Sequence, residues 1–534
     1  MSTTATSYSK KMCWLIGLTI LVKICLSFFL ELGNDEVYYY TYALQPDWNH
    51  FDHPGMVGWM MRLTSLNLNW VNTLSMRLGS IFCAAGASWV LFRTGTLLKD
   101  ESAGYIAAWI YTLSIYTSII AGLFVLPDSP QLLFFTLSIY WMVKYVVAPQ
   151  SFTTKDWILL GLFIGLATLS KVHGLYLWIG FGAYILFHHT KTLKNRNLYL
   201  AILITIVCIL PILYWNIQND FITYRYHSKR VMHTGLLVDS FIQQIIGELL
   251  YQNPLVYIAV LVSLLNRKRL KTAFQNAALP LLLWLSLPLI FTFWGLSLFN
   301  PTLPHWTGPG FIALFLIAGV YWSGRSNRKL KDADPNKAAN IPLIIKWAGG
   351  LLGVLIIGFL LLVYVFPKQL GSDKLSNLGE YNPINDVTGW NDFSVAFENI
   401  VIKNKQSGEM KGSTPIIVNK WFPAGHILFY TARPLQMSVF AIGALEDVHK
   451  FAWLNDRLAQ QNKGLKIGDD AYCIVPSNLP SDPLLLYGNY FDKIEKPDTI
   501  PVVSKGVLLR NFYVFRLKKC LAIPPSILPN KFTK

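Results

Sequence analysis

Residues 13–40 read CWLIGLTILVKICLSFFLELGNDEVYYY, and this stretch decides the class of the fold. Its first part, residues 13–30, is almost entirely apolar and follows Lys10 and Lys11. A run of about 20 such residues is long enough for a helix to cross the hydrocarbon core of a bilayer. An acidic segment comes next, without a clear small-residue cleavage site. We therefore expect a retained membrane helix and not a secretory signal peptide.

The composition of the whole chain also indicates a membrane protein. Of its 534 residues, 53% are hydrophobic and only 14% are charged, whereas globular domains carry about 25% charged residues. Disorder is excluded because it requires much charge and little apolar content. The net charge of +17 does not indicate nucleic-acid binding, because such proteins gather their basic residues on a soluble face.

Further apolar runs extend this pattern along the first two thirds of the chain. They occupy residues 73–92, 103–123, 129–147, 157–170, 172–188, 198–215, 242–265, 277–298, 308–322 and 341–366. Together with the first run they predict a polytopic α-helical membrane protein with about eleven spanning helices.

The distribution of basic residues predicts how these helices are oriented. Lys and Arg gather in every second connection, from Lys10 and Lys11 to the linker 323–340. The positive-inside bias places these connections and the N-terminus in the cytoplasm. The other connections are richer in acids, Trp, His and Pro, and we expect them outside: 31–72, 124–128, the turn at Lys171, 216–240 and 299–307.

The chain changes character after residue 366, where it becomes polar and is interrupted by prolines. Short alternating stretches lie at 415–421, 471–476 and 507–517, and helical patterns lie near 393–403 and 445–460. We expect a transmembrane domain at 1–366 and an extracytoplasmic α+β domain at 367–534. In that compartment Cys473 and Cys520 would either form a disulfide or remain free thiols.

The first outward loop, 31–72, holds the densest group of ionisable side chains. Asp35 and Glu36 follow the first apolar run closely, and Asp52 and His53 precede the next helix. A cluster of carboxylates beside a bilayer is costly because the charges are partly desolvated, so it marks a candidate active site. The alternative is an ordinary solvated loop in which Asp35 interacts with a helix end.

Other outward segments add polar residues on the same predicted side of the membrane. Asp128 follows Pro127 and either only caps the next helix or also belongs to the site. Lys171 lies between two short apolar runs and either snorkels to the interface or contacts a phosphate. Arg225 lies in an aromatic, basic segment that suits an interfacial belt or a phosphate group, and His305 lies in a proline-rich turn.

In chain order, these motifs resemble those of the GT-C membrane glycosyltransferases. More narrowly, they are similar to the bacterial dolichyl-phosphate-mannose-protein mannosyltransferase-like group, which includes the aminoarabinose (ArnT-like) transferases. The matching pieces are Asp35-Glu36 with Tyr38–Tyr40, Phe51–Pro54 with Trp59, Pro127–Pro130, Leu169–Lys171, Trp215-Asn216, Pro304–Trp306, Gly389-Trp390 and Leu428–Tyr430. They span nearly the whole chain.

The resemblance implies a GT-C fold and a transferase of the bacterial inner membrane. Such an enzyme moves a sugar from a polyprenyl-phosphate donor to a lipid, glycan or protein acceptor on the outer face, and lipid A modification is one example. Aminoarabinose transferases carry Glu-Lys-Pro-Pro where this chain has Asp52-His53-Pro54-Gly55, and an arginine where it has Tyr38. These differences leave the sugar and the acceptor open.

The resemblance also implies roles for individual residues. Asp35 is the expected general base of an inverting single displacement, and Glu36 would orient the loop or bind sugar. The donor phosphate would be bound by Lys171, His53, Arg225 and His305. Substrate contacts are expected from Tyr38, Tyr39, Asp52, Asp128, Trp215, Asn216 and Trp306. The chemistry requires no cofactor, although Asp52, His53 and His305 would also suit a divalent metal. A retaining mechanism would instead need a carboxylate nucleophile.

Two other classes of function are compatible with the sequence. A transporter or flippase of lipid-linked sugars would carry ionisable residues near the middle of the membrane and often repeated halves. A membrane anchor or binding module would make the outer domain the active part. In the preferred hypothesis the partners are the lipid-phosphate sugar donor, an envelope acceptor and the bilayer, with no nucleic acid.

Overall fold

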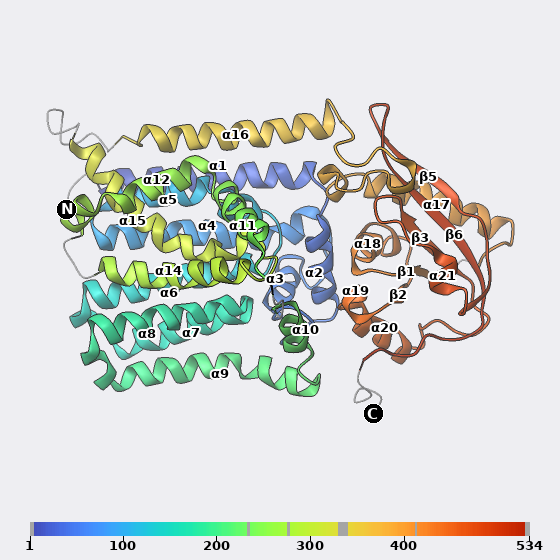
Figure 1. Ribbon diagram of the computed structural model, residues 1–534, viewed down its shortest axis with the longest axis horizontal. Coiled ribbons are helices and arrows are strands. Elements are labelled where there is room, and N and C mark those ends of the chain that lie inside the picture. Colours follow the sequence, from blue (N-terminus) through green and yellow to red (C-terminus); the bar gives the residue numbers. More distant parts are fainter. Residues whose placement is uncertain (1–4, 232–234, 275–277, 329–339, 412–413, 529–534) are drawn as a thin grey trace. The chain divides into compact units, whose positions relative to one another are not determined.

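A computed structural model describes residues 5–231, 235–274, 278–328, 340–411 and 414–528 (Figure 1). Most of the predicted linker 323–340 lies outside these residues. The chain divides into two compact units. Unit 1 comprises Met1–Ser27, His53–Ile217 and Phe221–Leu355, and unit 2 comprises Phe28–Asp52, Gln218–Asp220 and Ile356–Lys534. Most of the loop that holds Asp35 is therefore grouped with the C-terminal part, which differs from the predicted single boundary at residue 366.

Unit 1 is helical, and several of its helices run alongside one another (Figure 1). Its helices, three of which continue a short way into unit 2, are α1 (Ala5–Phe29), α3 (Met56–Thr64), α4 (Thr73–Leu98), α5 (Glu101–Leu113), α6 (Asp128–Val147), α7 (Thr154–Ser170), α8 (Tyr176–His188), α9 (Arg196–Gln218), α10 (Ile222–Val231), α11 (Val238–Tyr251), α12 (Pro254–Leu265), α13 (Arg267–Ala273), α14 (Ala278–Ser297), α15 (Gly308–Arg328) and α16 (Leu343–Tyr364). Short helical turns include η1 (Tyr116–Ile120), η3 (Val172–Leu175) and η5 (Pro304–Thr307).

Each apolar run predicted from the sequence contains a helix, and the chain is a multi-pass membrane protein. Within the described residues, seven helices are long and apolar enough to cross a membrane, or eight if α11 and α12, which are bent by 99°, form one span. The other predicted spans are shorter helices. The run 103–123 is interrupted after α5, which has 13 residues, and α7 has 17.

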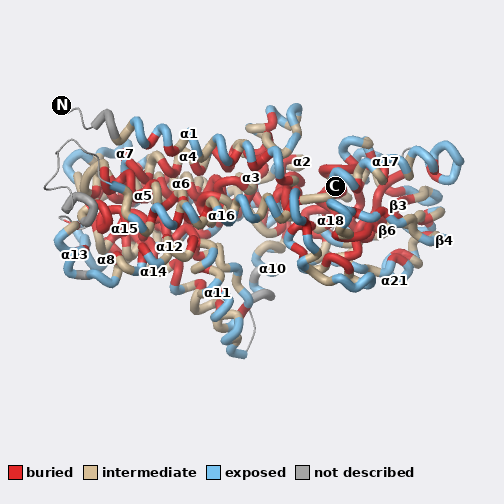
Figure 2. Tube along the Cα trace, turned by 90° about the horizontal axis from the view of Figure 1, so that it is seen from above, coloured by how far each residue is buried: buried red, intermediate tan, exposed pale blue. Residues whose placement is uncertain are grey.

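The helices of unit 1 differ widely in how far they are enclosed (Figure 2). The most apolar stretch of 18 residues in each helix shows this. In Pro304–Gly324, which contains most of α15, 94% of that stretch is buried, whereas in α16 the buried share is 11%. Glycines allow neighbouring helices to approach closely. A Cβ atom at Gly95 of α4 would collide with the backbone of Gly104 of α5, and small residues are typical of such helix contacts in membranes.

Unit 2 is the predicted α+β domain and contains a six-stranded mixed sheet. The strands are β1 (Ile416–Val418), β2 (Val439–Ala441), β3 (Ala471–Pro476), β4 (Phe491–Ile494), β5 (Asp498–Ser504) and β6 (Val507–Cys520). Their order is β2-β1-β3-β6-β4, and β5 also pairs with β6. β1 is parallel to β2 and β3, whereas β6 is antiparallel to β3, β4 and β5. The helices are α2 (Asn34–Leu44), α17 (Trp390–Gln406), α18 (Trp421–His426), α19 (Leu445–Val448), α20 (Phe451–Gln460) and α21 (Pro483–Tyr487), together with the turns η7 (Pro383–Asp386) and η8 (Ile427–Ala432).

Directed hydrogen bonds join residues 28–52 to the rest of unit 2. The carboxylate of Glu31 accepts from the backbone N–H groups of Trp390 and Asn391, each at 2.9 Å. It therefore stabilises the first turn of α17, where N–H groups have no partner within the helix. The backbone N–H of Leu32 donates to the hydroxyl of Tyr430 at 2.5 Å. These bonds fix the entry to α2.

The two cysteines of unit 2 are buried and carry free thiols. Cys473 on β3 lies opposite Phe515 of β6, and Cys520 on β6 lies opposite Phe491 of β4. The two residues occupy different ladders of the sheet, so the disulfide alternative is wrong.

Candidate functional site

Three polar side chains meet inside unit 1, and we call them the lysine–aspartate cluster: Tyr116, Asp128 and Lys171. The ammonium nitrogen of Lys171 lies 3.0 and 2.8 Å from the two carboxylate oxygens of Asp128. The hydroxyl of Tyr116 donates to the first of these oxygens at 2.8 Å. All three side chains are buried. A charge in a dry interior is tolerated when it is paired and hydrogen-bonded, as here.

Local structure explains how the two charges meet. Helix α7 ends at Ser170, and Lys171 then takes an extended conformation. Its carbonyl accepts from the side-chain amide of Gln131 on α6 at 3.0 Å. The N-cap position of α6 is Pro127, and the carboxylate of Asp128, the first residue of the helix, accepts from Lys171 and Tyr116 instead. The capping interpretation of Asp128 is therefore wrong, and so is snorkelling of Lys171, which is only 2% exposed.

Three histidines, His53, His173 and His305, interact with the lysine–aspartate cluster or with one another. His305 in η5 interacts electrostatically with both Asp128 and Lys171. His53 interacts in the same way with His305. Of the residues predicted to bind a phosphate, the structure thus brings Lys171, His53 and His305 into one region of unit 1. Trp306 lies at the edge of this region, with its ring centroid 6.4 Å from that of His173.

The remaining predictions for unit 1 fall elsewhere. Arg225 is exposed on α10, and no interaction within the described residues joins it to Asp128 or Lys171. Trp215 and Asn216 are buried near the end of α9. The amide of Asn216 donates to the carbonyl of Ile212 within the helix at 3.0 Å. Substrate contact by Trp215 and Asn216 stays a prediction.

Unit 2 contains a second polar group, the tyrosine–aspartate cluster of Tyr38, Tyr42 and Asp52. Tyr38 donates its hydroxyl to Asp52 at 2.9 Å, and Tyr42 donates to the same carboxylate oxygen. Burial raises the pKa of both tyrosines well above the ordinary value, so they remain neutral donors. The rings of Tyr38 and Tyr39 are buried, and their centroids lie 5.4 Å apart. Contact of these two residues with substrate stays a prediction.

Asp35 and Glu36 take different positions at the start of α2. The carboxylate of Glu36 accepts from the backbone N–H of Gly33 at 2.9 Å and is buried. This contact stabilises the first turn of the helix. Asp35, one residue earlier, is exposed. Of the two acids predicted to be catalytic, Glu36 therefore stabilises the start of α2, whereas Asp35 faces solvent.

Comparison with known proteins gives consistent results. Residues 52–215 match the family described as dolichyl-phosphate-mannose-protein mannosyltransferase. The chain is similar to the lipid A galacturonosyltransferase RgtD of Rhizobium johnstonii, with 22% identity over 369 residues, covering 66% of this chain and 71% of that protein. It also resembles ArnT from Cupriavidus metallidurans in the apo state, with a TM-score of 0.61, 14% identity, and coverage of 95% of this chain and 98% of that one. The structure of that protein bound to undecaprenyl phosphate gives a TM-score of 0.58 at 13% identity, with coverage of 94% and 97%.

The chain is a membrane glycosyltransferase with the GT-C fold, and it is similar to the ArnT-like group. The matched family segment, residues 52–215, includes Asp52, His53, Asp128 and Lys171. These four candidate residues that the sequence singled out therefore lie in the matched segment, whereas His305, Trp306 and Arg225 lie outside it.

Sequence reasoning missed two buried groups of the glycosyltransferase. Tyr116 completes the lysine–aspartate cluster, yet nothing distinguishes it from the other tyrosines of the chain. Glu248 on α11 is fully buried and accepts from the indole N–H of Trp294 at 3.0 Å and the hydroxyl of Tyr257 at 3.2 Å. The sequence does carry a signal for Glu248, which is the single acid inside the apolar run 242–265. Ionisable residues within membrane segments are rare and commonly functional.

A divalent metal at Asp52, His53 and His305 stays a prediction. Among the residues that the structure describes, no three His, Cys, Asp or Glu side chains come together as a metal site. The positive charge next to Asp128 in the structure is the side chain of Lys171.

Lys450 is a buried cation in unit 2, next to the tyrosine–aspartate cluster. It is 1% exposed, and its ammonium lies 5.7 Å from the ring centroid of Trp453. Burial lowers its pKa to about 7 from the ordinary 10.5; Arg457 adds to this effect, whereas Asp47 opposes it. Below pH 7 the lysine is charged in both the folded and unfolded states, and its burial destabilises the fold. Between pH 7 and 10.5 the unfolded chain binds the proton more tightly, so stability rises with pH.

We therefore expect Lys450→Met to raise the melting temperature of the purified protein more at pH 7 than at pH 9.5. Thermal unfolding in detergent at the two pH values measures this difference. Lys496→Met removes an exposed lysine of the same unit and should show little change at either pH. Equal shifts for Lys450→Met at both pH values would contradict the lowered pKa.

Proposed function

We propose that this glycosyltransferase moves a sugar from a polyprenyl-phosphate donor to an acceptor on the outer face of the bacterial inner membrane. Two similar proteins support the proposal. RgtD is a lipid A galacturonosyltransferase, and the structure of ArnT has been solved with bound undecaprenyl phosphate. A glycolipid of the lipid A type is the first acceptor to test. The N-terminus would lie in the cytoplasm and unit 2 outside, as the basic connections indicate.

The observation that carries the proposal is the buried contact between Lys171 and Asp128. A lysine ammonium has three N–H donors, and the two carboxylate oxygens of Asp128 account for two of them. The third can donate to an oxygen of the donor phosphate. Asp128 holds the ammonium in place, and Tyr116 holds Asp128. His53 and His305 would supply further donors to the same phosphate.

These donors would act on the leaving group of the reaction. As the bond between the anomeric carbon and the phosphate oxygen breaks, negative charge grows on the polyprenyl phosphate. Fixed donors that meet this charge lower the barrier, because they need no reorganisation when the bond breaks. The proposal requires no metal, since Lys171 provides the positive charge.

Asp35 would act on the acceptor. Glu31 and Glu36 bind backbone N–H groups at helix starts, and Asp52 accepts from two tyrosines. Asp35 is the exposed acid of this segment. In an inverting displacement the acceptor oxygen attacks the anomeric carbon while Asp35 takes the hydroxyl proton. Polyprenyl phosphate leaves from the opposite face of the sugar.

The test uses the purified protein in lipid nanodiscs with an undecaprenyl-phosphate sugar and a lipid A-type glycolipid. We expect mass spectrometry to detect the acceptor enlarged by one sugar, and NMR to show an inverted anomeric centre. A parallel experiment in sealed vesicles measures movement of the donor across the bilayer. Donor movement without any covalent product would overturn the proposal in favour of a flippase, and retention of configuration would overturn the role of Asp35.

A further inference from the structure

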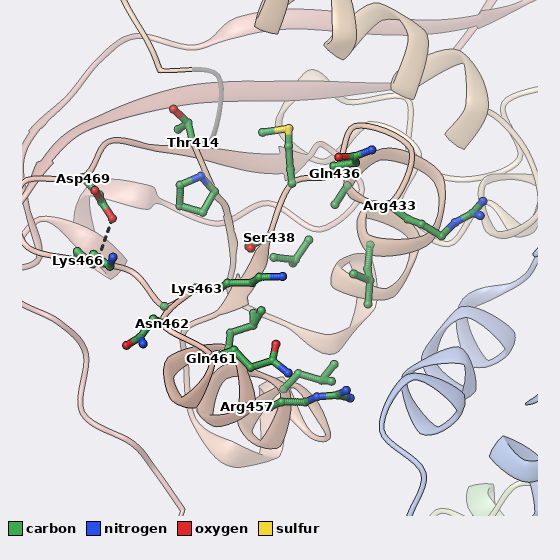
Figure 3. A pocket seen from close by; sticks show the side chains of 18 of the residues that line it. Thr414, Arg433, Gln436, Ser438, Arg457, Gln461, Asn462, Lys463, Lys466 and Asp469 are labelled. Carbon is green, nitrogen blue, oxygen red and sulfur yellow. Dashed lines mark hydrogen bonds between the residues drawn. The ribbon is translucent and has the colours of Figure 1, made fainter. Parts of the chain in front are cut away.

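Unit 2 contains a pocket of about 740 Å³ between β2, η8 and α20 (Figure 3). This volume is in the range that binds small organic ligands, roughly 300–1,000 Å³. Part of the wall is apolar and comes from Phe451, Leu454 and Leu458 on α20 and from Val439 on β2. All lining residues belong to unit 2, and none is part of the tyrosine–aspartate cluster.

Basic side chains dominate the charge of this pocket. They are Lys411, Arg433, Arg457, Lys463 and Lys466. Figure 3 shows Lys463 reaching across the centre of the view, with Gln461 and Arg457 on one side and Gln436 on the other. Arg433, which directly follows η8, lies at a different side of the view from Arg457. The cations thus come from different segments of the chain.

Both acids of the pocket are engaged by other groups. Asp470 forms an ion pair with Lys518 at 3.2 Å and accepts from the backbone N–H of Lys519 at 2.9 Å. Asp469 accepts from the backbone N–H of Lys466 at 2.9 Å (Figure 3). Because Lys518 lies outside the pocket and offsets Asp470, the basic side chains leave the interior positive.

Two of the cations are held in defined orientations. Arg457 donates one N–H to the carbonyl of Leu44 at 2.7 Å. Arg433 donates to the carbonyl of Phe429 at 3.2 Å, and its guanidinium lies 4.9 Å from the ring centroid of that residue. A guanidinium has five N–H donors, so Arg457 keeps donors for a ligand. Orienting the donors before binding lowers the entropy lost when a ligand arrives.

We propose that this pocket binds an anionic saccharide, a sugar that carries phosphate or carboxylate groups. Arginine forks and lysines match such oxyanions. The side-chain amides of Gln436, Gln461 and Asn462 can donate to and accept from sugar hydroxyls. The apolar wall suits the faces of sugar rings. That this saccharide is the head group of the acceptor rests on the proposed function, whereas the preference for an anionic sugar rests on the pocket alone.

The test measures binding to the full chain in nanodiscs of neutral lipid by isothermal titration calorimetry. The probe is a glucosamine disaccharide with two phosphates and no acyl chains. Its unphosphorylated form, inorganic pyrophosphate and a short polyglutamate peptide are compared with it. We expect the phosphorylated disaccharide to bind most tightly and more weakly as salt rises. Lys463→Gln and Arg433→Gln should each weaken it by about tenfold or more, since hydrogen bonds to charged groups are strong.

Lys496→Gln is the matched control, because it removes one exposed lysine next to β4, at the sheet edge opposite β2. It should leave binding unchanged. Equal binding of the unphosphorylated disaccharide, tighter binding of polyglutamate, or no effect of Lys463→Gln would each overturn the proposal. Pyrophosphate binding as tightly as the disaccharide would reduce the site to one for free phosphate and overturn the role of the sugar. Sugar transfer that depends on Asp35, together with absent binding here, would refute this inference and leave the proposed function standing.

Discussion

Asp35→Asn is expected to reduce sugar transfer by about 10²- to 10⁴-fold, the usual contribution of a general base. The amide has nearly the same shape as the carboxylate but cannot take the proton of the acceptor hydroxyl. Asp35 is exposed at the start of α2, so the substitution should leave the melting temperature nearly unchanged. The measurement is kcat in nanodiscs with the polyprenyl-phosphate sugar, together with thermal unfolding of the same preparation.

Two further variants separate catalysis from helix stability. Glu36→Gln keeps a side-chain oxygen that can accept from the N–H of Gly33, so it should retain most activity. Asp392→Asn changes an acid in the first turn of α17, which is likewise exposed, and controls for the loss of a helix-start charge. Asp35→Asn activity within a few-fold of the unchanged enzyme would refute the role of Asp35 as base.

Local patterns predicted much of the fold because they depend on neighbouring residues. The alternating stretch 471–476 became β3, and the helical pattern near 393–403 lies within α17. The apolar runs became helices, but breaks such as the end of α5 at Leu113 shortened some of them. A run of apolar residues indicates that a segment forms a helix. It does not show at which residue tertiary packing ends that helix.

Long-range contacts decided what the sequence could not predict. Glu31 looked like one of several loop acids, but its partners Trp390 and Asn391 lie about 360 residues away along the chain. This contact helps to place residues 28–52 in unit 2. Lys171 and Asp128 were each predicted as candidates, and their pairing depends on how α6 meets the end of α7. Without that geometry, snorkelling and capping were reasonable interpretations of the two residues.

Breaking the lysine–aspartate cluster is expected to have the largest effect on stability. Lys171→Met leaves the carboxylate of Asp128 buried without its cation, and Asp128→Leu leaves the ammonium buried without its anion. Removing one partner of a buried ion pair typically costs about 3–5 kcal/mol. Lys144→Met is the matched control, because Lys144 pairs with Asp156 at 2.8 Å but is 24% exposed. Such partly exposed pairs contribute only about 0–1 kcal/mol.

The double variant Lys171→Met/Asp128→Leu distinguishes the structural role of the pair from its role in transfer. Replacing both charges by apolar side chains of similar size removes the unpaired charge, so the melting temperature should return close to that of the unchanged protein. Transfer should stay low, because no ammonium remains to meet the charge that grows on the leaving phosphate. Thermal unfolding and the KM for the polyprenyl-phosphate donor measure the two effects separately. If the double variant regains both stability and activity, Lys171 serves only the fold, and the donor phosphate must be bound by other residues.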